Sequence, residues 1–377
     1  MCKGQKQTWQ KLSLLDKNKK TIWFHCASLG EFEQARNLIE YVKNNKKEYQ
    51  ILLTFFSPSG YEVRKDYKYA DCICYLPFDS LNNAKRFVKT ADPEITFFIK
   101  YEFWWNYINE LKDRKLYSVS LILRNSHYLF ASYSSWFRKQ LQSFDFFFVQ
   151  DQNTANLLGN INYPNHIICG DTRFDRVLSM SEEKKCFPVI ERFKDGKKLF
   201  LAGSSWPEDE KIIRQVSEEI RDIKIIIAPH LIDKGHINSL LNQFPDSIPF
   251  SSLNEDNCTK HDVLIIDNIG MLMYLYSLCD IAYIGGGFGA GIHNILEAAV
   301  FDKPVCFGPN NKKFKEAQDL IESGAAKEIH DKKDLQMWIK KLLGEQTEYK
   351  RLAAISGNYV RENTGATDKI CSMVFNV

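Results

Sequence analysis

Residues 281–299 read Ile281-Ala282-Tyr283-Ile284-Gly285-Gly286-Gly287-Phe288-Gly289-Ala290-Gly291-Ile292-His293-Asn294-Ile295-Leu296-Glu297-Ala298-Ala299. A short apolar run, typical of a buried strand, leads into five glycines within seven residues. The pattern then predicts a helix that begins near Ile292. Such a turn brings backbone N–H groups close to a phosphate. We therefore predict a nucleotide site here, with Glu297, one helical turn after Asn294, binding the two hydroxyls of a ribose.

This stretch matches neither of two common phosphate-binding motifs. It is not a Walker loop, because no Gly-Lys-Ser/Thr follows the glycines. It is a poor dinucleotide fingerprint, because it lies near the end of the chain rather than in an N-terminal βαβ unit. One alternative stays open, in which the glycines serve only tight packing.

Outward from this segment, short apolar runs alternate with longer amphipathic segments along nearly the whole chain. This alternation predicts an α/β fold with parallel sheets. The predicted strands are residues 21–26, 50–56, 72–76, 95–99, 116–121, 144–149, 166–169, 198–202, 223–228, 263–266, 281–284 and 304–307, with helices such as 32–44 and 81–90 between them. We predict two Rossmann-like domains, residues 1–180 and 198–377, the second ending in helices from residue 333 onward. The charged stretch 181–197 is the expected linker.

Composition excludes several classes of protein. The chain has 377 residues, of which 44% are hydrophobic and 26% charged, so it is neither disordered nor a polytopic membrane protein. A net charge of +3 is too balanced for a protein that coats nucleic acid, and we expect no nucleic-acid partner. The cysteines form no C-x-x-C pair, which predicts reduced thiols in the cytosol. No apolar run is long enough to span a membrane.

The first twenty residues are strongly basic. They contain six lysines and a single acid, Asp16. The lysines are Lys3, Lys6, Lys11, Lys17, Lys19 and Lys20. Two interpretations stay open: an arm that binds an anionic membrane surface, or a solvated and frayed terminus.

Two loops that follow predicted strands carry polar side chains. In the first, Gly30 suits a tight turn and places Glu31 in the first turn of the next helix, where the helix dipole favours a carboxylate. Glu31 is then either a catalytic base or an ordinary first-turn acid, which is the interpretation we prefer for Glu33. In the second, residues 56–60, Ser57 could present a hydroxyl to an anion or sugar, although a plain capped turn explains it nearly as well.

Taken in order, the loop motifs resemble those of one family. They are Ser28-Leu29-Gly30-Glu31, Ser57-Pro58-Ser59-Gly60, Glu102-Phe103-Trp104, residues 121–126, Gly170-Asp171-Thr172-Arg173-Phe174-Asp175, Ala202-Gly203-Ser204-Ser205, Pro229-His230, Gly270-x-Leu272, Gly285-Gly286, residues 293–299 and Gly308-Pro309. The set is similar to that of the bacterial 3-deoxy-D-manno-octulosonic acid (Kdo) transferases of lipopolysaccharide synthesis. Any one motif is weak, but the ordered set is specific.

The resemblance implies a GT-B fold, in which two Rossmann-like domains face a central cleft. It implies inverting transfer of Kdo from CMP-Kdo to a lipid A precursor of the lipid IVA type, with Glu31 as general base and neither cofactor nor metal. The implied donor-binding residues are Ser204, Ser205, Pro229, His230, Gly270, Gly285, Gly286, Gly287, His293, Asn294 and Glu297. The implied acceptor-binding residues are Ser57, Gly60, Lys100, Glu102 and Arg124. The implied location is the cytoplasmic face of the inner membrane, held peripherally or by an anchor segment not present in this chain.

The sequence departs from the family pattern at several points. Relatives often have Pro-Arg-His where this chain has Ala228-Pro229-His230, so a phosphate-facing arginine is missing. Lys100 stands where an acid is common, and Trp105 stands where proline is common. Relatives usually begin with a hydrophobic anchor, whereas this chain begins with the basic segment.

Two alternative functions remain. The first is a non-hydrolysing UDP-sugar 2-epimerase of the same architecture, which would need several acids rather than one base. The second is a catalytically inactive nucleotide-sugar-binding protein, against which the intact Glu31 loop argues.

Overall fold

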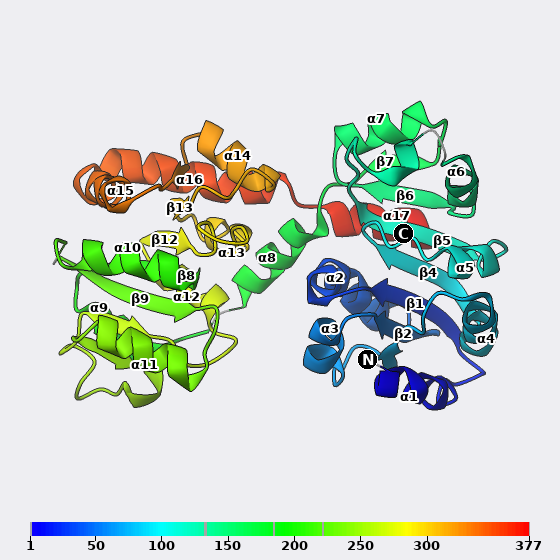
Figure 1. Cartoon of the computed structure of the whole chain (residues 1–377), viewed down its shortest axis with the longest axis horizontal. Helices are drawn as coiled ribbons and strands as arrows, with labels where there is room; N and C mark the ends of the chain where they lie inside the picture. The colour runs from blue at the N-terminus through cyan, green and yellow to red at the C-terminus, as the bar shows by residue number, and fades with distance from the viewer. Residues whose placement is uncertain (1, 132–133, 184, 221, 377) are drawn as a thin grey trace. The chain divides into compact units, whose positions relative to one another are not determined.

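The chain forms two structural units, each built on a parallel sheet (Figure 1). The computed structural model describes residues 2–131, 134–183, 185–220 and 222–376. Residues 1–176 and 363–377 make up the first unit, and residues 177–362 make up the second. The predicted α/β class, with two Rossmann-like units, is confirmed.

Within the described residues, the sheet of the first unit has seven strands in the order β3-β2-β1-β4-β5-β6-β7. All neighbouring strands run parallel. The strands are β1 (Lys20–Cys26), β2 (Tyr49–Phe55), β3 (Cys72–Tyr75), β4 (Pro93–Ile99), β5 (Lys115–Leu121), β6 (Phe146–Val149) and β7 (His166–Ile168). Each overlaps a predicted strand, because strands buried on both faces are near-continuous apolar runs.

Helices cover both faces of this sheet (Figure 1). Successive side chains of a strand point to opposite faces, so β1 sends Phe24 into one core and Trp23 into the other. The helices are α1 (Cys2–Leu12), α2 (Leu29–Asn45), α3 (Pro58–Arg64), α4 (Leu81–Ala91), α5 (Trp105–Glu110), α6 (Ser135–Leu141), α7 (Gln152–Asn160) and α17 (Ala366–Phe375). A 3-10 turn, η1 (Tyr128–Phe130), precedes α6.

The last residues of the chain return to the first unit, which differs from the expected division. Helix α17 buries Ile370 and Val374 in the same core as α2. The Asp175 carboxylate accepts hydrogen bonds from the backbone N–H groups of Gly365 and Thr367, both at 2.6 Å. An acid at the start of a helix satisfies N–H groups that have no partner inside the helix. The motif at residues 170–175 therefore fastens the C-terminal helix to the first sheet.

The basic N-terminal segment is neither an arm nor a frayed end. Thr8 of α1 is fully buried, and its hydroxyl donates to the Tyr75 carbonyl at 2.7 Å. The Lys11 ammonium donates to the Tyr61 hydroxyl at 2.6 Å and to the Ile73 carbonyl at 2.9 Å. The side chains of Lys3 and Lys6 lie outside the described residues. Helix α1 is thus packed against the edge of the sheet, and Lys11 is a structural residue.

The second unit repeats the architecture. Its described residues form a seven-stranded sheet in the order β10-β11-β9-β8-β12-β13-β14, with all pairs parallel. The strands are β8 (Lys198–Ser205), β9 (Ile223–Pro229), β10 (Ser247–Pro249), β11 (Val263–Ile265), β12 (Ile281–Ile284), β13 (Val305–Phe307) and β14 (Ala326–Glu328). The helices are α10 (Pro207–Ser217), α11 (Lys234–Gln243), α12 (Leu272–Leu278), α13 (Leu296–Ala299), α14 (Lys315–Glu322), α15 (Lys332–Gly344) and α16 (Gln346–Glu362), with a 3-10 turn η2 (Phe250–Ser252).

The division between the units also differs from the expected linker at residues 181–197. Helix α8 (Thr172–Glu182) crosses the division, which falls after Arg176. A further helix, α9 (Pro188–Lys194), occupies most of the predicted linker. It buries Ile190 and Phe193, three residues apart on one helical face. This segment therefore packs as part of the second unit rather than connecting the two.

None of the helices in the described ranges has the length and apolarity that a membrane crossing requires.

Candidate active site

The predicted catalytic and acceptor residues of the first unit follow four neighbouring strands. Glu31 follows β1, Ser57 and Gly60 follow β2, Lys100 and Glu102 follow β4, and Arg124 follows β5. These strands are adjacent and parallel, so their carboxyl ends lie at one edge of the sheet. Ligands of open α/β sheets bind at this edge.

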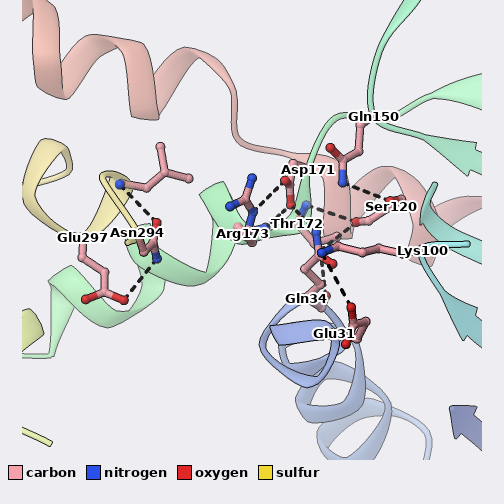
Figure 2. A network of polar contacts seen from close by, with 11 residues as sticks. Glu31, Gln34, Lys100, Ser120, Gln150, Asp171, Thr172, Arg173, Asn294 and Glu297 are labelled. Atoms are coloured by element: carbon pink, nitrogen blue, oxygen red, sulfur yellow. Dashed lines mark hydrogen bonds and ion pairs between the residues drawn. The ribbon is translucent and has the colours of Figure 1, made fainter. Parts of the chain in front are cut away.

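Glu31 is held by a capping box at the start of α2. Its Oε2 atom accepts hydrogen bonds from the Ser28 backbone N–H, at 2.9 Å, and from the Ser28 hydroxyl. Its Oε1 atom faces the Lys100 ammonium at 3.7 Å, as Figure 2 shows. One carboxylate oxygen therefore fixes the helix start, and the other is directed toward the loop after β4.

Lys100 adopts a backbone conformation that is unusual for a lysine. Its φ angle is +63°, in the left-handed region that favours glycine. The strand pairing holds it there, because its N–H donates to the Val119 carbonyl at 2.8 Å and its carbonyl accepts from the Ser118 hydroxyl at 2.9 Å. Strained residues of this kind cluster at functional sites, where the surrounding structure enforces them.

Glu102 is a largely buried carboxylate. Its Oε2 atom accepts the indole N–H of Trp104 at 2.8 Å and lies 3.8 Å from Nε2 of the fully buried His25. Burial raises the pKa of Glu102, but the neighbouring His25, Trp104 and Lys100 outweigh it, and the net pKa is lowered. The carboxyl group is therefore ionised at neutral pH.

The remaining residues at this edge have plainer environments. The Ser57 hydroxyl accepts the Ser59 N–H at 3.1 Å and caps α3, as the plain-turn interpretation predicts. Gly60 is needed for close packing, because a Cβ there would lie 2.3 Å from the Phe55 ring. Arg124 is exposed. No described contact joins Ser57, Gly60 or Arg124 directly to Glu31.

A buried polar network lies at the end of the first unit (Figure 2). The Asp171 carboxylate accepts the Gln34 amide at 3.0 Å and the Arg173 guanidinium at 2.8 Å. The Thr172 hydroxyl donates to the Gln34 carbonyl at 2.7 Å. Since Gln34 lies on the same helix as Glu31, this network fixes α2 from its far side. The sequence analysis did not assign Gln34 a role.

In the second unit, the helix after the glycines begins later than predicted. It is α13, which starts at Leu296 rather than near Ile292. Asn294 precedes it, accepts the Leu296 N–H at 3.2 Å and donates its amide to Oε1 of Glu297 at 3.1 Å (Figure 2). The two predicted ribose and phosphate ligands are therefore in direct contact, although Asn294 lies before the helix and not one turn inside it.

The glycine-rich loop packs tightly against β8. A Cβ at Gly285 would lie 2.2 Å from the Ser204 carbonyl oxygen. Ser204 itself has a φ of +52°. The N–H groups of Gly285 and Gly286 are already bonded, to the Gly203 carbonyl at 2.8 Å and to Asp209 Oδ2 at 2.9 Å. These two N–H groups are not free for a phosphate, so tight packing accounts for part of the glycine pattern.

Three aromatic rings stack beside this loop. Trp206 and His230 lie 4.8 Å apart, and His230 and His293 lie 4.5 Å apart. The Trp206 indole donates to Nε2 of His293 at 3.1 Å. Burial, with a smaller contribution from His230, lowers the pKa of His293 to about 4. His293 is thus neutral at pH 7, and its remaining proton is on Nδ1.

Two acids that the sequence analysis missed organise this region. Asp209 is fully buried and accepts from the Tyr283 hydroxyl at 2.6 Å as well as from the N–H groups of Gly286 and Trp206, both at 2.9 Å. Glu210 accepts the Ser205 hydroxyl at 2.9 Å. The Ser205 hydroxyl proton is therefore committed to Glu210. Residues 206–210, with a proline and three acids directly after β8, carried a helix-start signal that could have directed attention here.

The other predicted donor residues are less connected. Pro229 ends β9, and the next residue, His230, donates its N–H to the Ser205 carbonyl at 2.9 Å. Gly287 packs against Gly308. Gly270 has a φ of +94° and precedes α12, without a described contact to the glycine-rich loop. Over the described ranges, no cluster of three or more His, Cys, Asp or Glu side chains is arranged to hold a metal ion.

Sequence relatives point consistently in one direction. A family model described as 3-Deoxy-D-manno-octulosonic-acid transferase (kdotransferase) matches residues 5–176. A protein of that name from Rickettsia bellii is 26% identical over 375 residues, which cover 95% of this chain and 88% of the relative. Its namesake from Aquifex aeolicus is 28% identical over 340 residues, 88% of each chain.

Solved structures of similar fold are more distant in sequence. The UDP-GlcNAc 2-epimerase of Neisseria meningitidis, solved with UDP-GlcNAc bound, has a TM-score of 0.64 at 15% identity and covers 95% of this chain and 100% of its own. A glycosyltransferase from Rickettsia africae has a TM-score of 0.58 at 14% identity, covering 94% of this chain and 98% of its own. At such identities the likeness concerns the fold alone.

Proposed function

This chain belongs to the Kdo transferase family of GT-B glycosyltransferases, and from that premise we propose that it transfers Kdo from CMP-Kdo to a lipid A precursor of the lipid IVA type. Membership makes the protein a glycosyltransferase, and Kdo transfer in lipopolysaccharide synthesis is the activity of the family. The donor, the acceptor and the base are our proposal. The observation that supports it best is the environment of Glu31.

Glu31 has one carboxylate oxygen available for proton transfer. Ser28 occupies Oε2 with two hydrogen bonds, whereas Oε1 faces the loop after β4. In the proposed step, the acceptor hydroxyl attacks the anomeric carbon of Kdo while Oε1 takes its proton. The bond from that carbon to the phosphate oxygen breaks, and CMP leaves with the electron pair. A positioned base typically contributes 10²–10⁴-fold to such a step.

Other residues would bind the two substrates. Lys100, beside Glu31, and the exposed Arg124 would meet acceptor phosphates, because both carry positive charge at the carboxyl edge of the sheet. In the second unit, Glu297, oriented by Asn294, would bind the ribose hydroxyls. His293 would offer Nδ1–H as a neutral donor to the phosphate or the Kdo carboxylate.

We propose that the transfer step needs neither metal nor cofactor. Neutralisation of the leaving phosphate would then fall to N–H groups and side chains of the second unit. With preformed CMP-Kdo, excess EDTA should leave the transfer rate unchanged. A loss of activity that Mg²⁺ restores would contradict this part of the proposal.

We further propose that the protein acts at the cytoplasmic face of the inner membrane. Each methylene of an acyl chain costs about 0.8 kcal/mol to move into water, so the enzyme must approach the lipid acceptor. Trp136, Tyr101 and Tyr128 are 55%, 47% and 37% exposed near the carboxyl edge of the first sheet, and such amphipathic rings suit a membrane interface. Trp136 packs on Trp105, which follows β4, with ring centres 6.1 Å apart.

The lysines of the N-terminal segment lie at the other end of the strands. Lys17, Lys19 and Lys20 line a hollow of about 970 Å³ together with Pro93 and Lys115, which begin β4 and β5. A seven-residue strand separates the two edges of the sheet by roughly 20 Å. A flat bilayer cannot contact both surfaces, so we assign membrane contact to the aromatic side and not to these lysines.

The proposed function is tested by mass spectrometry of the product formed from CMP-Kdo and a tetra-acylated lipid A precursor. The expected result is a lipid heavier by one or more Kdo residues, with release of CMP. Absence of such a product, together with turnover of a UDP-sugar, would instead favour the epimerase alternative.

A further inference from the structure

His25 has a place in the first sheet that its position in an apolar run does not suggest. Its side chain is fully buried, and the strand register sets it opposite Thr54 of β2 and Phe98 of β4. Its ring also meets Trp104 edge to face, with ring centres 5.3 Å apart. A buried imidazole needs partners for both nitrogens, because an unpaired polar atom in the interior is costly.

One nitrogen has a clear partner. Nδ1 of His25 lies 2.9 Å from the Thr54 hydroxyl oxygen, which also accepts the indole N–H of Trp23 at 2.8 Å. The Thr54 hydroxyl has one proton to give. Its other acceptor within reach is the Phe24 carbonyl, at 3.4 Å, which makes a much longer hydrogen bond. The shorter geometry favours donation from Thr54 to Nδ1.

That donation decides where the proton of the neutral ring is. If Nδ1 accepts from Thr54, Nε2 carries the hydrogen. Nε2 lies 3.8 Å from Oε2 of Glu102 and has no hydrogen-bond partner among the described residues. An N–H directed at a carboxylate is attractive, whereas a nitrogen lone pair in that place would be repelled. Both ends of the ring therefore favour the same tautomer.

We propose that His25 is a positioning residue for Glu102, and that Trp23, Thr54 and His25 form a buried relay of donated hydrogen bonds that ends on this carboxylate. The relay runs from the Trp23 N–H to the Thr54 hydroxyl, from that hydroxyl to Nδ1, and from Nε2–H to Glu102. With the Trp104 N–H on the same oxygen, it fixes the carboxylate beside Lys100 and Glu31. The role of Glu102 in orienting the acceptor rests on the proposed function; the relay itself does not.

The tautomer of His25 is measurable without any substrate. Two-bond 15N–1H correlation spectra of the 15N-histidine-labelled protein distinguish Nε2–H from Nδ1–H rings, and a His25→Gln variant identifies the signal. We expect the Nε2–H form. The Nδ1–H form would overturn the proposal whether or not the protein transfers Kdo.

Kinetics of matched threonine variants test the consequence. Thr54→Val keeps the shape and removes the relay hydroxyl, whereas Thr54→Ser keeps the hydroxyl and removes a methyl group. Thr96→Val makes the same change in the neighbouring strand β4, where the buried Thr96 hydroxyl has no described hydrogen-bond partner. All variants are compared at a temperature where thermal melts show them folded.

We expect Thr54→Val to lower kcat about 10-fold or more through misplacement of Glu102, while Thr54→Ser and Thr96→Val stay within about threefold of the parent. A purely packing role predicts the reverse order for the two Thr54 variants. Wild-type kinetics from Thr54→Val would overturn the proposal. If the parent itself forms no Kdo product, the proposed function fails, and the tautomer measurement still decides the relay.

Discussion

Glu31→Gln separates the basicity of Glu31 from its role in the fold. Glutamine at this position also completes a capping box, so the Ser28 N–H keeps an acceptor. The lost charge at the helix start costs about 0.3–1 kcal/mol of stability, and the lost contact with Lys100 at most about 1 kcal/mol more. An amide cannot take the proton of the acceptor hydroxyl. We therefore expect kcat to fall about 10²-fold or more, or roughly 2.7 kcal/mol of transition-state stabilisation.

The matched control is Glu33→Gln, which removes the same charge from the same end of α2. Glu33 pairs with Arg64 at 2.8 Å and Arg36 at 3.5 Å, so its loss affects stability more than chemistry. The assay is the initial rate of CMP release at saturating CMP-Kdo and lipid acceptor, with CMP affinity measured by calorimetry. Only Glu31→Gln should lose kcat, while both variants bind CMP normally. More than about a tenth of the parent kcat in Glu31→Gln would refute the assignment of the base.

Three further outcomes are expected. Glu297→Ala should weaken CMP binding by roughly 1–3 kcal/mol in calorimetry, because the ribose hydroxyls lose their partner; unchanged affinity would place the donor site elsewhere. Asp209→Ala should lower unfolding free energy by more than about 2 kcal/mol in urea titrations, since it strands three buried donors; near-native stability would contradict this. Trp136→Ser should reduce co-sedimentation with anionic liposomes more than the double variant Lys17→Gln/Lys19→Gln, and the opposite order would return membrane contact to the lysine-lined hollow.

The sequence predicted most strands but missed two. Strands β10 (Ser247–Pro249) and β14 (Ala326–Glu328) lie at the edges of the second sheet, have three residues each and include polar positions. An edge strand pairs on one side only, so it needs no continuous apolar run to bury it. The return of α17 to the first unit was equally hidden, because its partner Asp175 is 190 residues away from Gly365.

The candidate site was predictable where chemistry follows a strand directly. Glu31 and Lys100 stand at strand ends, and the structure brings them within 3.7 Å of each other. Asp209 escaped notice because it binds Gly286 across 77 residues of sequence. His25 escaped notice for a different reason: alternation assigned it to the apolar interior, and the pattern carries no information about which atoms of a buried ring are paired.

The protonation of the acids bears on the choice between transfer and epimerisation, which the fold does not decide. An isomerase that removes and returns a proton needs acids able to hold that proton near neutral pH, whereas a transferase needs one ionised carboxylate. Glu102 remains ionised, because His25, Trp104 and Lys100 outweigh its burial and lower its pKa. Burial raises the pKa of Asp209, but its oxygens are occupied by three donors and are not available to a substrate. Glu31, with one oxygen in a cap and the other at the sheet edge, is the described acid whose environment fits a single base, and this favours transfer.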